Sequence, residues 1–194
     1  MISERNMDKS AGRRELRVAG FGGQGVVLFG EIVGKGASIF DKGFATLTQS
    51  YGPEARGGSC TAEVVVSREP IGYPRVVSPE VVVILAQEAY ANYGRNPPKG
   101  TAVIVDPDLV KTDPAVQPAP LSVPATRMAR EMNRPVVANI IMLGFLAAVS
   151  DLVSHNALRE AVRASVPEGT EDLNLSAFDK GSAYGQGQVG HKGM

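Results

Sequence analysis

Short apolar runs, each bounded by turn residues, recur along the first half of the chain, and segments of helical periodicity lie between and after them. The runs cover residues 43–48, 60–67, 81–85 and 101–105, and an earlier one begins near Val18. Their length and their content of Val, Ile and Thr predict strands. Helical segments are expected at residues 26–40, at 86–93 and from 125 onward. This alternation predicts an α/β fold.

Two connections bear on the predicted sheet. Residues 68–75 lead from one predicted strand toward the next, and they are too few for the helical crossover that parallel neighbours require. They favour a turn or hairpin connection, so a mostly parallel sheet has room for an antiparallel pairing. Residues 106–124 contain five prolines, which predicts an extended segment along a sheet edge.

The second half of the chain is predicted to be helical, and one of its helices is very apolar. Residues 135–149 carry a single polar side chain, Asn139, and a helix that is apolar on all sides is expected to be central to the fold. Burying an unpaired amide costs about 1–3 kcal/mol, so Asn139 needs a partner. Two interpretations stay open: a bond to nearby backbone, or a place in a binding site. Ser154 and Thr170 are expected to cap the next two helices.

Composition and charge narrow the class of protein. The chain has 194 residues, of which 43% are apolar and 21% charged, as in an ordinary globular domain. We place this domain at residues 15–183, between flexible tails at 1–14 and 184–194. Basic and acidic residues number 20 each, so no nucleic-acid partner is indicated. The N-terminus lacks a secretory signal, and no apolar run reaches the ~20 residues of a membrane span. We expect a cytoplasmic protein without a membrane partner.

The few cysteines and histidines argue against catalysis by this chain alone. The single cysteine, Cys60, excludes an internal disulfide and an iron–sulfur cluster held by this chain, and no metal site is expected. An inert, buried Cys60 is favoured over a reactive thiol. His155 lies at a predicted helix start and His191 in a predicted tail, and no GxSxG motif is present. We therefore predict no catalytic residue here.

The stretch VAGFGGQGVVLFG at residues 18–30 predicts a strand, a tight glycine turn and the start of a buried helix. Gly20, Gly22 and Gly25 have the GxGxxG spacing, which presents the backbone amides of a helix start to an anion, most often a phosphate. The pattern favours a Rossmann-like, three-layer domain. A nicotinamide dinucleotide is disfavoured, because the acid near the expected distance, Asp41, precedes the second strand instead of ending it.

A second glycine-rich segment, QSYGPEARGGS, lies at residues 49–59. Its Glu54 and Arg56 could form an exposed salt pair, which is the usual fate of loop charges. Alternatively, Arg56 recognises a phosphate or carboxylate. Both glycine segments follow predicted strands, so both are expected at the carboxyl edge of one sheet, where α/β folds bind ligands. We favour the binding-site interpretation.

Taken together, GFGGQG at residues 20–25 and TLTQSYGPEARGGS at 46–59 resemble the gamma subunit of the 2-oxoacid:ferredoxin oxidoreductases. The likeness extends over roughly residues 15–185, including NIIMLG at 139–144 and NLSAF at 174–178. It implies the fold of the corresponding domain of pyruvate:ferredoxin oxidoreductase. The second segment is most similar to the 2-oxoglutarate enzymes, and the pyruvate and branched-chain 2-oxoacid enzymes belong to the same group.

The resemblance implies one part of a multisubunit enzyme. Such enzymes decarboxylate a 2-oxoacid on thiamine diphosphate, pass electrons through iron–sulfur clusters to ferredoxin, and release an acyl-CoA. This chain lacks both the GDG motif for thiamine diphosphate and the cluster cysteines. Thiamine diphosphate, magnesium and the clusters are therefore expected on partner alpha and beta, and possibly delta, subunits. The role left to this chain is coenzyme A binding and assembly of the complex.

The resemblance also implies which residues face CoA or the active site. They come from both glycine segments and the apolar helix: Gly22, Gly23, Gln24, Gly25, Tyr51, Gly52, Glu54, Arg56, Gly57, Gly58 and Asn139. The first segment would meet a phosphate group, and the second would line the CoA passage or a subunit contact. Two alternatives stay open: a nucleotide-binding or scaffolding subunit that touches no substrate and, more distantly, a lone dehydrogenase.

Overall fold

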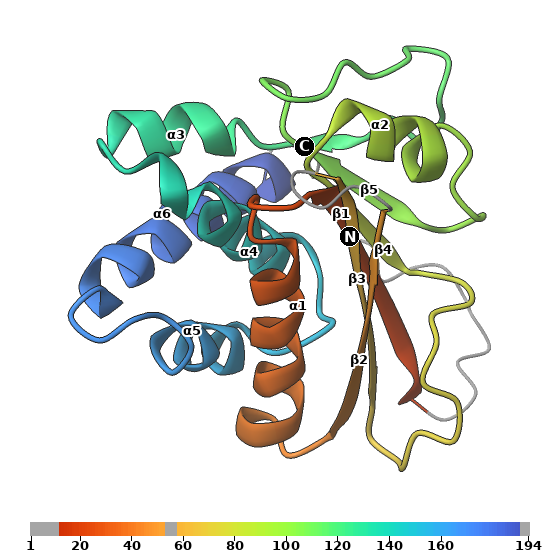
Figure 1. Ribbon diagram of the computed structural model, residues 1–194, viewed down its shortest axis with the longest axis vertical. Helices are drawn as coiled ribbons and strands as arrows, with labels where there is room; N and C mark the ends of the chain where they lie inside the picture. The colour runs from red at the N-terminus through yellow and green to blue at the C-terminus, as the bar shows by residue number, and fades with distance from the viewer. Residues whose placement is uncertain (1–11, 53–57, 191–194) are drawn as a thin grey trace.

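The computed structural model describes residues 12–52 and 58–190, which build a six-stranded sheet with helices on both faces (Figure 1). The strand order is β2-β3-β1-β4-β5-β6. The strands are β1 (Arg14–Phe21), β2 (Phe44–Tyr51), β3 (Ser59–Ser67), β4 (Val81–Ile84), β5 (Ala102–Val105) and β6 (Leu121–Ser122). The predicted α/β class is confirmed.

Strand β1 lies in the middle of the sheet and separates its antiparallel part from its parallel part. Val18 of β1 is opposite Ala62 of antiparallel β3 on one side and opposite Val83 of parallel β4 on the other. β2 pairs antiparallel with β3, while β5 and β6 continue the parallel side. The mixed sheet is therefore confirmed. A hairpin at residues 68–75 is wrong, because β3 and β4 flank β1 and do not pair with each other.

Most helices cover one face of the sheet. They are α1 (Val26–Lys35), the π-turn η2 (Gly36–Phe40), α3 (Ala125–Glu131), the 3₁₀ turn η4 (Pro135–Val137), α4 (Ala138–Val149), α5 (His155–Arg163) and α6 (Glu171–Gly190). The short α2 (Gln87–Ala89) and the π-turn η3 (Tyr90–Gly94) cover the opposite face beside β4 and β5 (Figure 1). Helices thus follow β1 and β4 on opposite sides.

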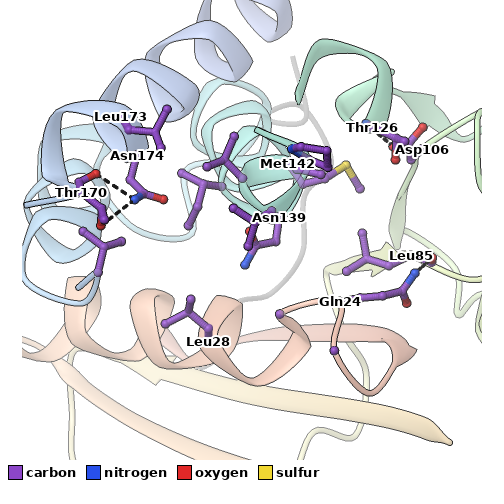
Figure 2. Close-up of a pocket in the computed structure, with 18 of the residues that line it drawn as sticks. Gln24, Leu28, Leu85, Asp106, Thr126, Asn139, Met142, Thr170, Leu173 and Asn174 are labelled. Carbon is purple, nitrogen blue, oxygen red and sulfur yellow. Dashed lines mark hydrogen bonds between the residues drawn. The ribbon is translucent and has the colours of Figure 1, made fainter. Parts of the chain in front are cut away.

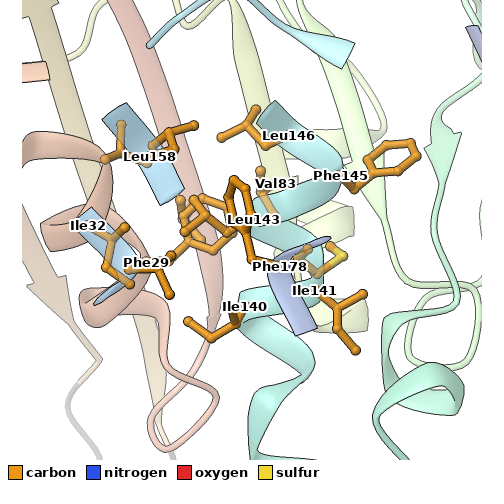
Figure 3. Packing of buried hydrophobic residues seen from close by; sticks show 14 of the residues in the cluster. Phe29, Ile32, Val83, Ile140, Ile141, Leu143, Phe145, Leu146, Leu158 and Phe178 are labelled. Carbon is orange, nitrogen blue, oxygen red and sulfur yellow. The ribbon is translucent and has the colours of Figure 1, made fainter. Parts of the chain in front are cut away.

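The larger core lies between the sheet and helices α1, α4, α5 and α6 (Figure 3). Phe29 of α1, Leu143 of α4 and Phe178 of α6 are fully buried within it. Helix α4 packs so closely on α6 that a Cβ at Gly144 would meet the carbonyl oxygen of Phe178. Its nearly continuous apolar surface is therefore explained by neighbours on several sides, as its composition predicts.

The structure differs from the predicted boundaries in four places. Helix α1 ends at Lys35 and continues as the π-turn, whose wider winding turns Ile39 away from the core and leaves it 52% exposed. Strand β2 continues through Tyr51, so the predicted loop at 49–59 begins later.

At the C-terminal end, α6 continues to Gly190, so the expected flexible end at 184–194 is wrong for residues 184–190. The region is glycine-rich, but a Cβ at Gly185 would lie 2.8 Å from the Cβ of Ala148. The absent side chain lets this part of α6 pack on α4. Strand β1 begins at Arg14, one residue before the predicted domain start. Residues 1–11 and 191–194 lie outside the described residues.

Candidate functional site

The carboxyl ends of β1, β4 and β5 lie at one edge of the sheet, where the parallel strands all end. Because the helices after β1 and β4 leave toward opposite faces, this edge contains a topological switch point (Figure 1). Open α/β sheets bind their ligands at such points. The glycine turn after β1 opens onto it.

The glycine turn leaves the start of α1 uncapped. Gly23 and Gly25 have φ values of 93° and 75°, in the left-handed region that favours glycine. Gly25 is the N-cap residue, and its carbonyl oxygen accepts from the Phe29 amide at 2.9 Å. No side chain of the described residues caps the helix, so its first-turn amides are available to an oxygen acceptor. The amide of Gly22 is already used, since it donates to the Gly58 carbonyl at 2.9 Å.

Backbone groups hold both polar atoms of the Gln24 side chain. Its side-chain oxygen accepts from the Phe21 amide at 2.6 Å. Its side-chain nitrogen donates to the Leu85 carbonyl at 2.8 Å (Figure 2). Both ends of the amide are therefore committed to backbone at the ends of β1 and β4. The side-chain nitrogen carries a second N–H, and Gln24 lines the cavity described below, so its expected phosphate contact stays a prediction.

Asn139 lies in the first turn of α4 and faces the start of α1. Its amide nitrogen is so close to Gly25 that a Cβ there would overlap it. The side chain is only 7% exposed, and it has no hydrogen-bond partner among the described residues. No side-chain polar atom of the described residues is both fully enclosed and unpaired, so the Asn139 amide opens onto a cavity. The alternative of a bond to nearby backbone is not observed.

The cavity beside Asn139 has a volume of about 530 Å³ (Figure 2), within the range of small-molecule sites. Gly23, Gly25 and Leu28 line it from the α1 side, and residues 135–140 line it from η4 and α4. Its remaining walls include Leu85, Val166 and Leu173. Thus two of the three predicted site regions, the first glycine segment and Asn139, meet at one place.

Sequence reasoning missed several polar residues of the cavity, among them Asp106 and Asn174. Asp106 follows β5 and is 1% exposed; its carboxylate accepts from the amides of Asp108 at 2.9 Å and Thr126 at 2.7 Å. It therefore holds the start of α3. Asn174 of α6 is 8% exposed, and its side-chain nitrogen donates to the carbonyl oxygen and hydroxyl of Thr170 at 2.9 and 3.2 Å. Each was hidden because its partners depend on tertiary packing or on the exact helix boundary.

The second glycine segment borders a separate, smaller depression of about 100 Å³ on the α2 side of the sheet. Tyr51 and Gly52 line it; Tyr51 is 66% exposed, and its hydroxyl donates to the Gln49 side chain at 2.7 Å. The Gly22–Gly58 hydrogen bond joins the two glycine segments. The predicted residues Glu54, Arg56 and Gly57 lie outside the described residues. The predicted single site is thus divided over two hollows.

The remaining candidate reactive groups, Cys60 and His155, pack against other side chains of the fold. Burial raises the pKa of the Cys60 thiol, as expected for an inert buried cysteine. The His155 ring lies 3.0 Å from the Ser182 hydroxyl and edge-on to Phe178. Within residues 12–52 and 58–190, no three His, Cys, Asp or Glu side chains gather as metal ligands. In the same ranges, every helix is too short or too polar to cross a membrane.

Comparison with known proteins gives the family. The sequence matches the family described as pyruvate ferredoxin/flavodoxin oxidoreductase over residues 15–184. The 2-oxoglutarate synthase subunit KorC of Methanocaldococcus jannaschii is 48% identical over 172 residues, which span 87% of this chain and 92% of the relative. KorC of Methanothermobacter thermautotrophicus (strain Delta H) is 46% identical over 176 residues, spanning 87% and 93%.

Two solved structures share the fold. The gamma subunit of a keto/oxoacid ferredoxin oxidoreductase from Geobacter sulfurreducens has a TM-score of 0.79 at 35% identity, covering 90% of this chain and 99% of that one. The 2-oxoglutarate:ferredoxin oxidoreductase from Magnetococcus marinus, solved with 2-oxoglutarate, coenzyme A and succinyl-CoA, also has a TM-score of 0.79, at 25% identity. It covers 92% of this chain and 32% of that longer one. By sequence and by fold, the chain belongs to the pyruvate ferredoxin/flavodoxin oxidoreductase family.

Proposed function

We propose that the chain is the gamma subunit of a 2-oxoglutarate:ferredoxin oxidoreductase. The complete enzyme converts 2-oxoglutarate, CoA and oxidised ferredoxin to succinyl-CoA, CO₂ and reduced ferredoxin. Relatives named KorC, a 2-oxoglutarate synthase subunit, support this assignment at 46–48% identity and over nearly their full length. Pyruvate and branched-chain 2-oxoacids are the alternative substrates.

The chain's own contribution is a contact with CoA, and one observation carries this part of the proposal. The buried amide of Asn139, which has no partner among the described residues, opens onto a cavity of about 530 Å³ beside the start of α1. Helix-start amides suit a phosphate oxygen, and apolar walls suit an uncharged part of the molecule. CoA contains both. When bound, it supplies the thiol that receives the acyl group.

Other steps are assigned to partner subunits. The chain carries one cysteine, and no metal-binding cluster occurs in its described part. Thiamine diphosphate, magnesium and iron–sulfur clusters are placed on alpha and beta, and possibly delta, subunits, and ferredoxin is reached through the complex. We place the complex in the cytoplasm. This chain would orient CoA and support assembly without a catalytic residue of its own.

The test is anaerobic purification of the tagged chain from its own host, followed by CoA-dependent reduction of a viologen dye. 2-Oxoglutarate, pyruvate and 3-methyl-2-oxobutanoate are compared as substrates. Activity with 2-oxoglutarate, and co-purification of thiamine-binding and iron–sulfur subunits, would support the proposal. A chain that purifies alone and oxidises no 2-oxoacid would overturn it.

A variant pair separates CoA binding from scaffolding. Asn139→Leu keeps the side chain's shape but removes its hydrogen-bonding groups, and Asn156→Leu at an exposed position of α5 is the control. We expect Asn139→Leu to raise the KM for CoA about tenfold, the equivalent of one hydrogen bond, with assembly and the KM for 2-oxoglutarate unchanged. Loss of subunits from the Asn139→Leu complex would favour the scaffolding role.

A further inference from the structure

Asn174 presents a fixed hydrogen-bond acceptor to the cavity from the side opposite α1. Its amide nitrogen is held by the carbonyl oxygen and hydroxyl of Thr170, which fixes the orientation of the side chain. The amide oxygen has no partner among the described residues. Since no enclosed polar side-chain atom of the described chain is unpaired, this oxygen opens onto the cavity that Asn174 lines.

The cavity therefore offers hydrogen-bonding groups on two walls (Figure 2). Asn139 places an amide nitrogen at the α1 start, and Asn174 places an acceptor on α6. Leu28 and Leu173 are among the apolar residues that line the space they share. A ligand part that fits must bring both an N–H donor and an acceptor on a largely apolar frame.

Charge further restricts the ligand. Among the described residues that line the cavity there is no Lys, Arg or His. The one carboxylate among the described lining residues, Asp106, already accepts two backbone amides. A dianion such as 2-oxoglutarate would meet no cationic side chain here, and one phosphate oxygen at the α1 start is the most negative group the wall favours.

We propose that this cavity binds an uncharged, donor-and-acceptor-bearing part of CoA, and that Asn174 is a specificity-determining contact for it. Two parts of CoA have this chemistry: the adenine base, whose amino group adjoins ring nitrogens, and the pantetheine arm, which carries two amides. An Asn side chain pairs well with either kind of edge. The inference rests on the proposed CoA role of the chain and extends it to a residue and a ligand part.

The experiment uses the assembled enzyme and two competitors of CoA, adenosine 3′,5′-bisphosphate and pantetheine. Inhibition constants are measured for wild type, Asn174→Ala, Asn139→Leu and the control Asn156→Leu. We expect both cavity variants to weaken the same competitor about tenfold and to leave the other unchanged. A higher inhibition constant for the bisphosphate places adenine in the cavity, and a higher inhibition constant for pantetheine places the pantetheine part of CoA there. If neither competitor shifts in Asn174→Ala, the inference is overturned.

A change in the ligand gives a test that needs no substitution. Deamino-CoA carries an oxygen where adenine has its amino group, so a base held at Asn174 through this group would present an acceptor in place of a donor. If adenine occupies the cavity, wild type should use deamino-CoA about tenfold less efficiently than CoA, and Asn174→Ala should lose this discrimination. If pantetheine occupies the cavity instead, wild type and Asn174→Ala should each use deamino-CoA and CoA with equal efficiency. The adenine placement is contradicted if the inhibition constant of the bisphosphate rises in the variants but wild type uses deamino-CoA as well as CoA.

The outcome also separates this inference from the proposed function. If Asn139→Leu raises the KM for CoA while Asn174→Ala does not, the CoA role stands and the Asn174 contact is refuted. If both variants leave CoA use and both competitors unchanged, the CoA role of this cavity falls as well. Should Asn174→Ala fail to assemble, Asn174→Ser, which is small and polar, takes its place.

Discussion

The side-chain nitrogen of Gln24 donates a 2.8 Å hydrogen bond to the carbonyl oxygen of Leu85, while its oxygen accepts from the Phe21 amide at 2.6 Å. Phe21 ends β1 and Leu85 directly follows β4. One side chain therefore ties the two strand ends on either side of the switch point. Gln24 lines the cavity with both ends of its side-chain amide bonded, whereas the Asn139 amide has no partner among the described residues.

Gln24→Ala is expected to lower the free energy of unfolding by about 1–3 kcal/mol, because it leaves a backbone donor and a backbone acceptor unpaired in a largely enclosed place. Urea unfolding of the purified chain measures the change. Gln49→Ala, on the exposed face of β2, is the matched control and should change stability by less than about 0.5 kcal/mol. Equal stability of Gln24→Ala and the control would show that the bridge contributes nothing.

Gly25→Ala is expected to be more destabilising than Gly23→Ala, although both glycines have a positive φ. A Cβ at Gly23 meets nothing within 4 Å, so that variant bears only the left-handed strain, about 1–2 kcal/mol. A Cβ at Gly25 would overlap the Asn139 amide. Adding Asn139→Ala should remove the extra cost. A double-mutant cycle by urea unfolding tests this coupling, and additive effects would contradict the contact.

Gly30→Ala and Gly34→Ala should act in opposite directions, although both lie in α1. At Gly30 a new Cβ would be 2.9 Å from Leu47 and 3.0 Å from Ala62, so we expect a net loss of about 1–2 kcal/mol from overpacking. At Gly34 the nearest atom is the Ala45 Cβ at 4.0 Å. That variant should gain about 0.5–1 kcal/mol from helix propensity. The free energies of unfolding of the two variants test this prediction. Changes of the same sign relative to wild type would refute the packing argument.

The features that the sequence predicts best are local ones. The strand, glycine turn and helix at residues 18–30 depend on neighbours along the chain, and they form as expected. Ser154 caps α5 as predicted, accepting from the Ala157 amide at 3.2 Å. In both cases the residues that decide the structure lie within a few positions of one another.

The features that sequence reasoning missed depend on distant partners. The sequence predicts that Gln24 faces a ligand. It does not reveal the hydrogen bond to Leu85, because that residue lies 61 positions away. The strand order could not be derived either, because β1 separates two strands that are consecutive in sequence. The glycines near the end of α6 indicate flexibility, yet packing against α4 overrides that propensity. The sequence indicates that Asn139 needs a partner, but only the tertiary structure shows that it lies against Gly25.

The ion pair between α5 and α6 is expected to give stability that is lost in acid. Arg159 donates to both carboxylate oxygens of Asp179, at 2.9 and 3.0 Å, and this bonding lowers the pKa of Asp179 below its ordinary value of 3.8. A carboxylate with a lowered pKa in the folded state binds protons more readily when unfolded. Its stabilisation is therefore present above about pH 4 and disappears as the pH falls through the lowered value.

Asp179→Asn should accordingly reduce stability at neutral pH and flatten its fall between about pH 5 and pH 2. The Asp179 side chain is 48% exposed, so screening by solvent keeps the effect below about 1 kcal/mol. Glu168→Gln removes an exposed carboxylate from the loop before α6 and serves as the control. Urea unfolding across this pH range measures both variants, and 1 M salt should shrink the difference between Asp179→Asn and wild type. Parallel pH curves for wild type and Asp179→Asn would mean that the Arg159 contact does not stabilise the fold.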